Sequence, residues 1–200
     1  MQESLMLYFD VFKNFSSPKG ERKISTIEVM SISWSLHLLY AFYSVFALFL
    51  GVKSYEYISG SEDFTHLVFS TLNIQIQKMT LLSTLFSVIL YPFIFQFGYR
   101  FWRALFKFYA QLFDREDAEF EDKADAILAS AFSCNLFLIF PIVGKFLSHL
   151  AHGFFIYKGM VSKYHFSSLQ AILVLLTPIF LVFLALVFTA SYFMFLLTLI

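Results

Sequence analysis

The chain has 200 residues, of which 59% are hydrophobic and only 14% are charged, whereas soluble domains carry about 25% charged residues. A soluble fold of this length could not bury so many apolar side chains, so the composition excludes an ordinary soluble domain. The 14 basic residues balance the 14 acidic ones, so no net charge favours nucleic acid as a partner. The single cysteine, Cys134, excludes an internal disulfide. The composition therefore predicts an α-helical integral membrane protein.

The N-terminal segment, residues 1–28, has an amphipathic pattern ahead of the first apolar run. Leu5, Phe9 and Phe12 recur at helical spacing, while charged side chains such as Lys13 take the other side. A helix with one apolar and one charged face lies in the plane of a membrane surface. We therefore expect a cytoplasmic interfacial helix in this segment.

Five apolar runs follow, and we interpret them as membrane spans because about 20 apolar residues cross a bilayer as a helix. The predicted spans cover residues 29–52, 79–99, 126–144, 146–160 and 168–200. The fourth span is the shortest and depends on a tight turn at Gly144 and Lys145. The expected fold is all-α: a polytopic transmembrane helical bundle of about five spans with interfacial amphipathic helices.

The fifth run is longer than one crossing requires. Ser167 and Gln170 form a capping-box pattern that predicts a helix start near Ser168. Pro178 predicts a kink about three turns further on, because proline removes a backbone hydrogen bond. No polar turn interrupts the run after this residue, so we expect one tilted, kinked span rather than a hairpin.

The basic residues predict the orientation, because cytoplasmic loops carry an excess of Lys and Arg. With five spans and a cytoplasmic N-terminus, three of the 14 basic residues, Lys53, Lys78 and Lys145, lie on the outer side, which leaves eleven in the cytoplasm. The inverted orientation fits this distribution worse. We therefore expect a multi-pass protein of the cell inner membrane with its N-terminus in the cytoplasm.

The cytoplasmic segment 100–125 between the second and third predicted spans is first amphipathic and then acidic. Arg100, Arg103 and Lys107 recur at i, i+3 and i+7, which forms a basic stripe on one helix face. Basic side chains near anionic headgroups contribute about 1 kcal/mol each, so the stripe is a candidate membrane-surface or partner-binding site. The run 114–125 holds seven acids and two bases, which is typical of a solvated loop, with a cation or basic-partner site as the alternative.

Two histidines of the fourth predicted span are the candidates for metal binding. His149 and His152 lie at i and i+3, a spacing that presents two imidazoles to one ion. A metal site needs further ligands, and no predicted span contains Asp or Glu. We favour the alternative that both histidines are polar anchors at the headgroup boundary, and we predict no metal and no cofactor. Motifs of hydrolases and nucleotide-binding enzymes are also missing from the sequence, which argues against an enzyme.

The order of elements from residue 126 to residue 187 carries a family pattern. A helix runs to a tight turn, the next helix ends in a Gly-Met pair, and a His-x-hydroxyl element precedes a proline-bearing final span. The residues that carry it are Phe140-Pro141-Ile142-Val143-Gly144, Gly159-Met160, Tyr164-His165-Phe166-Ser167, Ala171 and Pro178.

This succession resembles the bacterial branch of the Yip-domain family, which is named for eukaryotic members that interact with Rab-type GTPases. The resemblance implies that residues 29–200 form one Yip-like domain with five spans and a cytoplasmic N-terminus. The Asp-Leu-Tyr-Gly-Pro element of eukaryotic members is missing from the sequence, so the resemblance does not imply Rab binding.

These features favour a non-enzymatic integral membrane protein that acts as a scaffold and either binds a partner or organises lipid. Its expected partners are the lipid bilayer and either another protein or a second copy of the chain, and not nucleic acid. The alternative is a small transporter, channel or lipid scramblase, which needs a polar path between the spans. A metal-dependent membrane enzyme that uses His149 and His152 is the least favoured function.

Overall fold

The computed structural model describes residues 2–13, 24–59, 64–115, 118–141 and 143–198, with the backbone alone for residues 2, 4 and 48 and for the described residues in the range 51–77. All regular structure in these ranges is helical. In chain order the elements are α1 (Gln2–Lys13), α2 (Thr26–Ser59), α3 (Phe64–Leu112), α4 (Phe120–Ser133), the 3₁₀ helix η1 (Cys134–Ile139), α5 (Gly144–Lys163) and α6 (Ser168–Thr198). The prediction of an all-α fold is confirmed.

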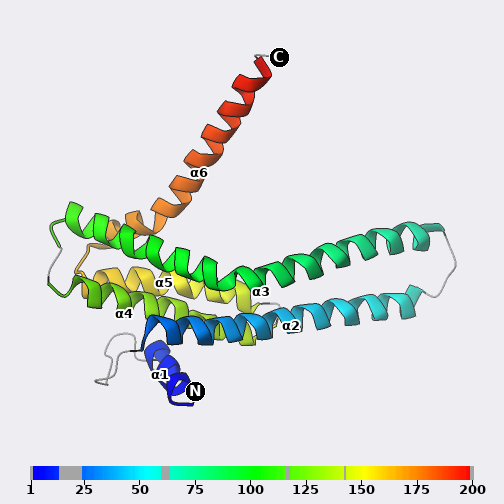
Figure 1. Cartoon of the computed structure of the whole chain (residues 1–200), viewed down its shortest axis with the longest axis horizontal. Helices are drawn as coiled ribbons and strands as arrows, with labels where there is room; N and C mark the ends of the chain where they lie inside the picture. The colour runs from blue at the N-terminus through cyan, green and yellow to red at the C-terminus, as the bar shows by residue number, and fades with distance from the viewer. Residues whose placement is uncertain (1, 14–23, 60–63, 116–117, 142, 199–200) are drawn as a thin grey trace.

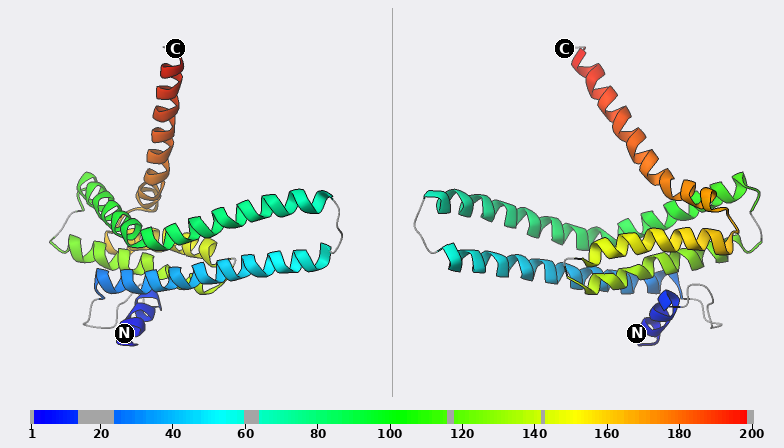
Figure 2. Two further views of the ribbon diagram at one scale, coloured as in Figure 1. Left: turned by 45° about the vertical axis from the view of Figure 1, so that its right-hand side comes forward. Right: turned by 180° about the vertical axis from the view of Figure 1, so that it is seen from behind.

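The molecule is built from two helical hairpins with one helix at either end of the chain (Figure 1). The long hairpin consists of α2 and α3, and the shorter one, which we call the inner hairpin, consists of α4, η1 and α5. The inner hairpin packs against α2 and α3 along only one half of their length, as all three views agree (Figures 1 and 2). The helix α1 lies across α2 and α4.

The buried core lies where the two hairpins meet. Tyr8 of α1 is fully buried there, and most of the other large buried side chains come from α3, α4 and α5, among them Phe106, Ile127, Leu128, Ile156 and Met160. Burying a side chain of this size contributes about 1.5–3 kcal/mol when the alternative is water. At one end of the molecule, α2 and α4 begin and α3 and α5 end; we call it the charged end. The core holds the inner hairpin to this end.

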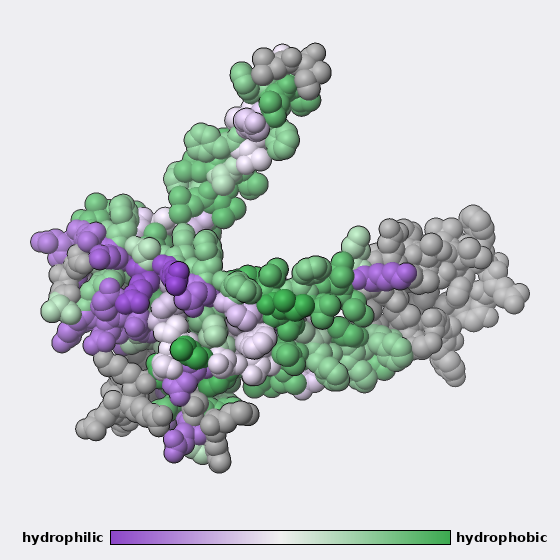
Figure 3. Space-filling model, in the orientation of Figure 1, coloured by the Kyte–Doolittle hydropathy of each residue, from purple (hydrophilic) through white to green (hydrophobic). Residues whose placement is uncertain are grey.

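Among the described residues, three helices contain segments that are long and apolar enough to cross a membrane, namely Thr26–Ala47, Lys78–Leu112 and Ser168–Thr198. They correspond to the first, second and fifth predicted spans. The surface supports this assignment: hydrophilic side chains gather at the charged end, and apolar side chains cover the middle of the long hairpin and α6 (Figure 3).

The third and fourth predicted spans are not confirmed as crossings. The expected span 126–144 is divided into α4, which already begins at Phe120, and the 3₁₀ turns of η1. The expected span 146–160 lies within α5, a helix of 20 residues that carries Lys145, Lys158 and Lys163. Neither element reaches the length and apolarity of the other three. Part of the acidic run that we expected to be a loop also forms the first turns of α4, where acidic side chains interact favourably with the helix dipole.

The helix α6 leaves the rest of the molecule after its first turns (Figure 1). Ala171 and Val174 are buried against the core, whereas nearly all side chains from Ile179 onward are exposed. The helix contains Pro178 and changes direction in its first half, in agreement with the predicted kink. The predicted capping box is confirmed, because the Ser167 amide donates to the Gln170 side chain and the Gln170 amide donates to Ser167 Oγ.

Candidate functional site

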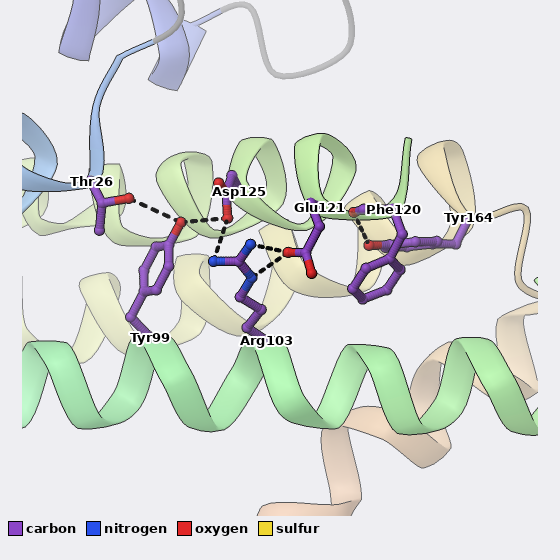
Figure 4. Close-up of polar contacts among 7 residues, drawn as sticks. All are labelled: Thr26, Tyr99, Arg103, Phe120, Glu121, Asp125 and Tyr164. Carbon is purple, nitrogen blue, oxygen red and sulfur yellow. Dashed lines mark hydrogen bonds and ion pairs between the residues drawn. The ribbon is translucent and has the colours of Figure 1, made fainter. Parts of the chain in front are cut away.

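The basic stripe on α3 was the strongest predicted surface site, and the structure divides its three members. The guanidinium of Arg103 donates hydrogen bonds to Glu121 of α4, and a further nitrogen lies 3.8 Å from Asp125 Oδ1 (Figure 4). Arg100 and Lys107 are exposed. The stripe is therefore not one uniform surface, because its central cation is used to join α3 to α4.

The contacts of Arg103 extend to α2 through a tyrosine. The Tyr99 hydroxyl donates to Asp125 Oδ1 at 2.8 Å, and Thr26 Oγ1 donates to the Tyr99 hydroxyl at 3.2 Å (Figure 4). We call these five residues, Thr26, Tyr99, Arg103, Glu121 and Asp125, the clasp. The clasp connects the first turn of α2, the last part of α3 and the start of α4, and so fixes the charged end.

A second polar contact closes the same end of the inner hairpin. The buried Tyr164, directly after α5, donates a hydrogen bond from its hydroxyl to the carbonyl oxygen of Phe120 at 3.0 Å (Figure 4). The ring of Tyr164 also packs against the ring of Phe120 with centroids 5.5 Å apart. The end of α5 is thereby attached to the start of α4.

A polar seam crosses the middle of the bundle where the inner hairpin approaches its turn. Asn135 of η1 donates to the Tyr91 hydroxyl at 2.8 Å and accepts a hydrogen bond from Ser148 Oγ at 3.0 Å. The ring of His37 stacks on that of Tyr91 with centroids 4.7 Å apart, and His37 Nε2 lies 3.4 Å from Ser87 Oγ. The seam therefore links α2, α3, η1 and α5 through side chains that satisfy one another.

The helix α1 is held to the bundle by a buried tyrosine. The Tyr8 hydroxyl donates to the carbonyl oxygen of Phe132 at 2.9 Å and lies 2.8 Å from Ser33 Oγ. Burial raises the pKa of the Tyr8 hydroxyl above its ordinary value, so the hydroxyl stays protonated and able to donate. Leu5 and Phe9, on the predicted apolar face, remain exposed, so α1 has one face on the protein and an apolar edge directed away from it.

The two histidines that were considered as candidate metal ligands, His149 and His152, contact separate backbone carbonyl groups. His149 is exposed, and its Nδ1 lies 2.6 Å from the carbonyl oxygen of Lys145. His152 Nδ1 lies 3.1 Å from the carbonyl oxygen of Ala131, and its ring packs on Phe132. Within the described ranges, no group of three or more His, Cys, Asp or Glu side chains is placed to hold a metal ion.

Sequence reasoning missed most of the residues that the structure brings together. Tyr8, Asp125 and Asn135 were not singled out, although each forms hydrogen bonds that join different helices. The signal for Asn135 was present, because it is the one side-chain amide in its apolar run, and a polar group in such a run needs a partner. For Asp125 the signal was its i, i+4 relation to Glu121, which places both carboxylates on one face of α4.

Comparison of the chain with protein-family models, with curated proteins and with solved structures finds no match. In the part of the chain that the structure describes, the class defined is an all-helical protein with three helices long and apolar enough to cross a membrane. The resemblance to the Yip-domain family stays a prediction.

Proposed function

We propose that the protein is a non-enzymatic, multi-pass membrane protein that acts as a scaffold within the bilayer and either binds a protein partner or organises the surrounding lipid. One observation carries this proposal: among the residues that the structure describes, each buried side-chain nitrogen and oxygen has a hydrogen-bond partner. Binding and catalytic sites instead direct a few polar groups towards the place of the substrate. Here the clasp and the polar seam are satisfied within the protein.

The proposed orientation has the charged end in the cytoplasm of a cell with an inner membrane. The excess of Lys and Arg in segments that meet at this end supports it. The orientation does not depend on how deeply the inner hairpin enters the bilayer, because a hairpin that starts and ends on one side contributes an even number of passages. The two ends of the long hairpin therefore keep their sides whether the chain makes three crossings or five.

The exposed cations of the basic stripe give the proposed scaffold a contact surface at the charged end. Arg100 and Lys107 lie on the same face of α3 and are both exposed. This position suits anionic lipid headgroups or an acidic segment of a partner. The order of elements from residue 126 to residue 187 is the basis for a proposed relation to the Yip-domain family, and the relation supports topology rather than a particular activity.

The proposal is tested by two measurements on the full chain. Cross-linking in native membranes, followed by purification in mild detergent, is expected to recover either a stoichiometric partner protein or an oligomer. Vesicles of phosphatidylcholine and phosphatidylglycerol that contain the purified protein are expected to show the same ion leakage and lipid exchange as protein-free vesicles. Protein-dependent flux of ions or lipid would replace the proposal with the transporter, channel or scramblase function.

A further inference from the structure

The depth of the inner hairpin can be measured against the long hairpin beside it. On α3 the apolar run extends from Met79 to Tyr99, about 30 Å at 1.5 Å per residue, which equals the thickness of the hydrocarbon core. Tyr99 takes part in the clasp at the charged end. Met79 therefore marks the opposite boundary of the apolar layer.

The polar seam gives the level that the inner hairpin has reached at Asn135. Tyr91, which accepts the hydrogen bond of Asn135, lies about 12 Å from Tyr99 and about 18 Å from Met79 along α3. The stacking of His37 on Tyr91 gives a matching level on α2. Asn135 therefore lies inside the apolar layer, on the side of its middle that is nearer the charged end.

The turn of the inner hairpin lies only slightly deeper. Ser148, which bonds to Asn135, lies one helical turn into α5, so the helix begins at Gly144 about 6 Å beyond the level of Asn135. The start of α5 then lies about 12 Å short of the level of Met79. The views agree, since α2 and α3 continue well past the turn (Figures 1 and 2).

The side chains around this turn are apolar and exposed. Phe140 is 54% exposed, Val143 is 52% exposed and Phe146 is 66% exposed. An exposed apolar cluster of this kind is favourable in acyl chains and costly in water. Lys145, which follows the turn, is exposed as well, and a lysine beside apolar surroundings keeps its charged group near polar ones by snorkelling.

We propose that the inner hairpin is a re-entrant element. It enters the hydrocarbon core from the cytoplasmic side, turns between η1 and α5 among the acyl chains and returns to the same side. Its ligand is the lipid interior, which contacts the apolar tip formed by Phe140, Val143 and Phe146. Only α2, α3 and α6 then cross the outer half of the bilayer. This inference rests on the proposed membrane embedding and orientation.

Single-cysteine variants of the full chain test the depth of the tip. Cys134→Ser removes the native thiol, which is buried against the carbonyl oxygen of Ser130, a contact that a serine hydroxyl can also make. Val143→Cys reports the tip, Ser162→Cys reports the charged end of α5, and Lys78→Cys reports the far end of α3; all three positions are exposed. Phe146→Cys serves as a second tip variant if Val143→Cys does not give a monodisperse protein in detergent.

A membrane-impermeant maleimide is expected to label Ser162→Cys only from the cytoplasmic side, Lys78→Cys only from the outer side and Val143→Cys from neither side. An environment-sensitive fluorophore attached at Val143→Cys before reconstitution is expected to be quenched more strongly by a spin label deep in the acyl chain than by one near the headgroup. Labelling of the tip from the outer side would overturn the proposal in favour of two full spans. Labelling of the tip from the cytoplasmic side would show that the hairpin lies outside the bilayer.

These outcomes are separate from failure of the proposed membrane topology. If that topology is wrong, Ser162→Cys and Lys78→Cys will be labelled from the same side, whatever the tip does. If the topology is right and only the re-entrant depth is wrong, these two controls will keep opposite sides and the tip alone will be labelled.

Discussion

Two glycines determine how closely the chain packs within the inner hairpin. A Cβ atom added at Gly144 would lie 2.2 Å from the backbone oxygen of Phe137, so no larger residue fits the turn as it stands. A Cβ atom added at Gly159 would lie 2.7 Å from Ile127 Cγ1. Because Ile127 is fully buried and β-branched, its side chain has little freedom to move aside. The close contact between α4 and α5 therefore requires a residue without a Cβ atom at position 159.

We expect Gly159→Ala to lower the free energy of unfolding by about 1–3 kcal/mol, because it overpacks the contact with Ile127. Gly153→Ala on the same helix is the matched control, since nothing lies within 4 Å of the added Cβ atom. Alanine is favoured over glycine inside a helix by about 1 kcal/mol, so the control should be neutral or stabilising. Thermal unfolding in detergent, monitored by tryptophan fluorescence, measures the unfolding midpoint of each variant. Equal midpoints for the two variants would contradict the close packing.

The sequence allowed few individual contacts to be predicted, and the reason is physical. Arg103 was identified as part of a stripe, but its partners in α4 follow a loop and depend on how the two helices pack. Tyr8 fits the apolar periodicity of its helix as well as Leu5 does. Its buried hydrogen bonds to Ser33 and Phe132 therefore cannot be recognised from the sequence pattern.

The clasp connects helices at the charged end, and its strength is limited by solvent. The side chains of Arg103 and Glu121 are 39% and 57% exposed, and ion pairs of this kind contribute about 0.2–1 kcal/mol. Its role is therefore to select the register of α4 on α3 rather than to supply most of the stability, which the buried core provides.

A double-mutant cycle with Arg103→Ala and Glu121→Ala is expected to give a coupling free energy of about 0.2–1 kcal/mol at low salt. The coupling should decrease at high salt, because salt screens exposed charges. Urea unfolding in detergent at two salt concentrations measures it. A cycle with Arg100→Ala and Glu121→Ala is the control, because Arg100 is an exposed cation of the same helix and is not a member of the clasp. Coupling of equal size in both cycles would show that general charge, and not the clasp, is responsible.

At the level of elements, the sequence predicted long uniform helices well and short interrupted ones poorly. The first, second and fifth spans follow from unbroken apolar runs, and the start of α6 follows from the hydrogen bonds of Ser167 and Gln170. The run 126–144 has the length of a span, but its helix changes to 3₁₀ geometry at Cys134. No residue near this position predicts the change. Run length alone could not distinguish a full crossing from a shorter hairpin.

Over the whole molecule, helices are distributed unequally along the long hairpin. The charged half of α2 and α3 is accompanied by the inner hairpin, whereas their other half has no such companion (Figures 1 and 2). Among the side chains that the structure describes, the buried core lies mainly in the charged half. Among the described side chains outside this half, Phe46, Phe86 and Phe183 are exposed, so lipid has to cover them if these helices cross the membrane.

With the inner hairpin in the cytoplasmic leaflet, the two hairpins together are broader on the cytoplasmic side than on the outer side (Figures 1 and 2). A bundle of this kind expands one leaflet more than the other, so its insertion is favoured where the broad side lies on a convex surface. We expect the share of molecules that present Ser162→Cys outward to be greater in small, highly curved vesicles than in large ones, as measured by impermeant maleimide labelling. An equal share at both sizes would contradict this shape. In the cell, such a molecule would gather where the membrane bulges towards the cytoplasm.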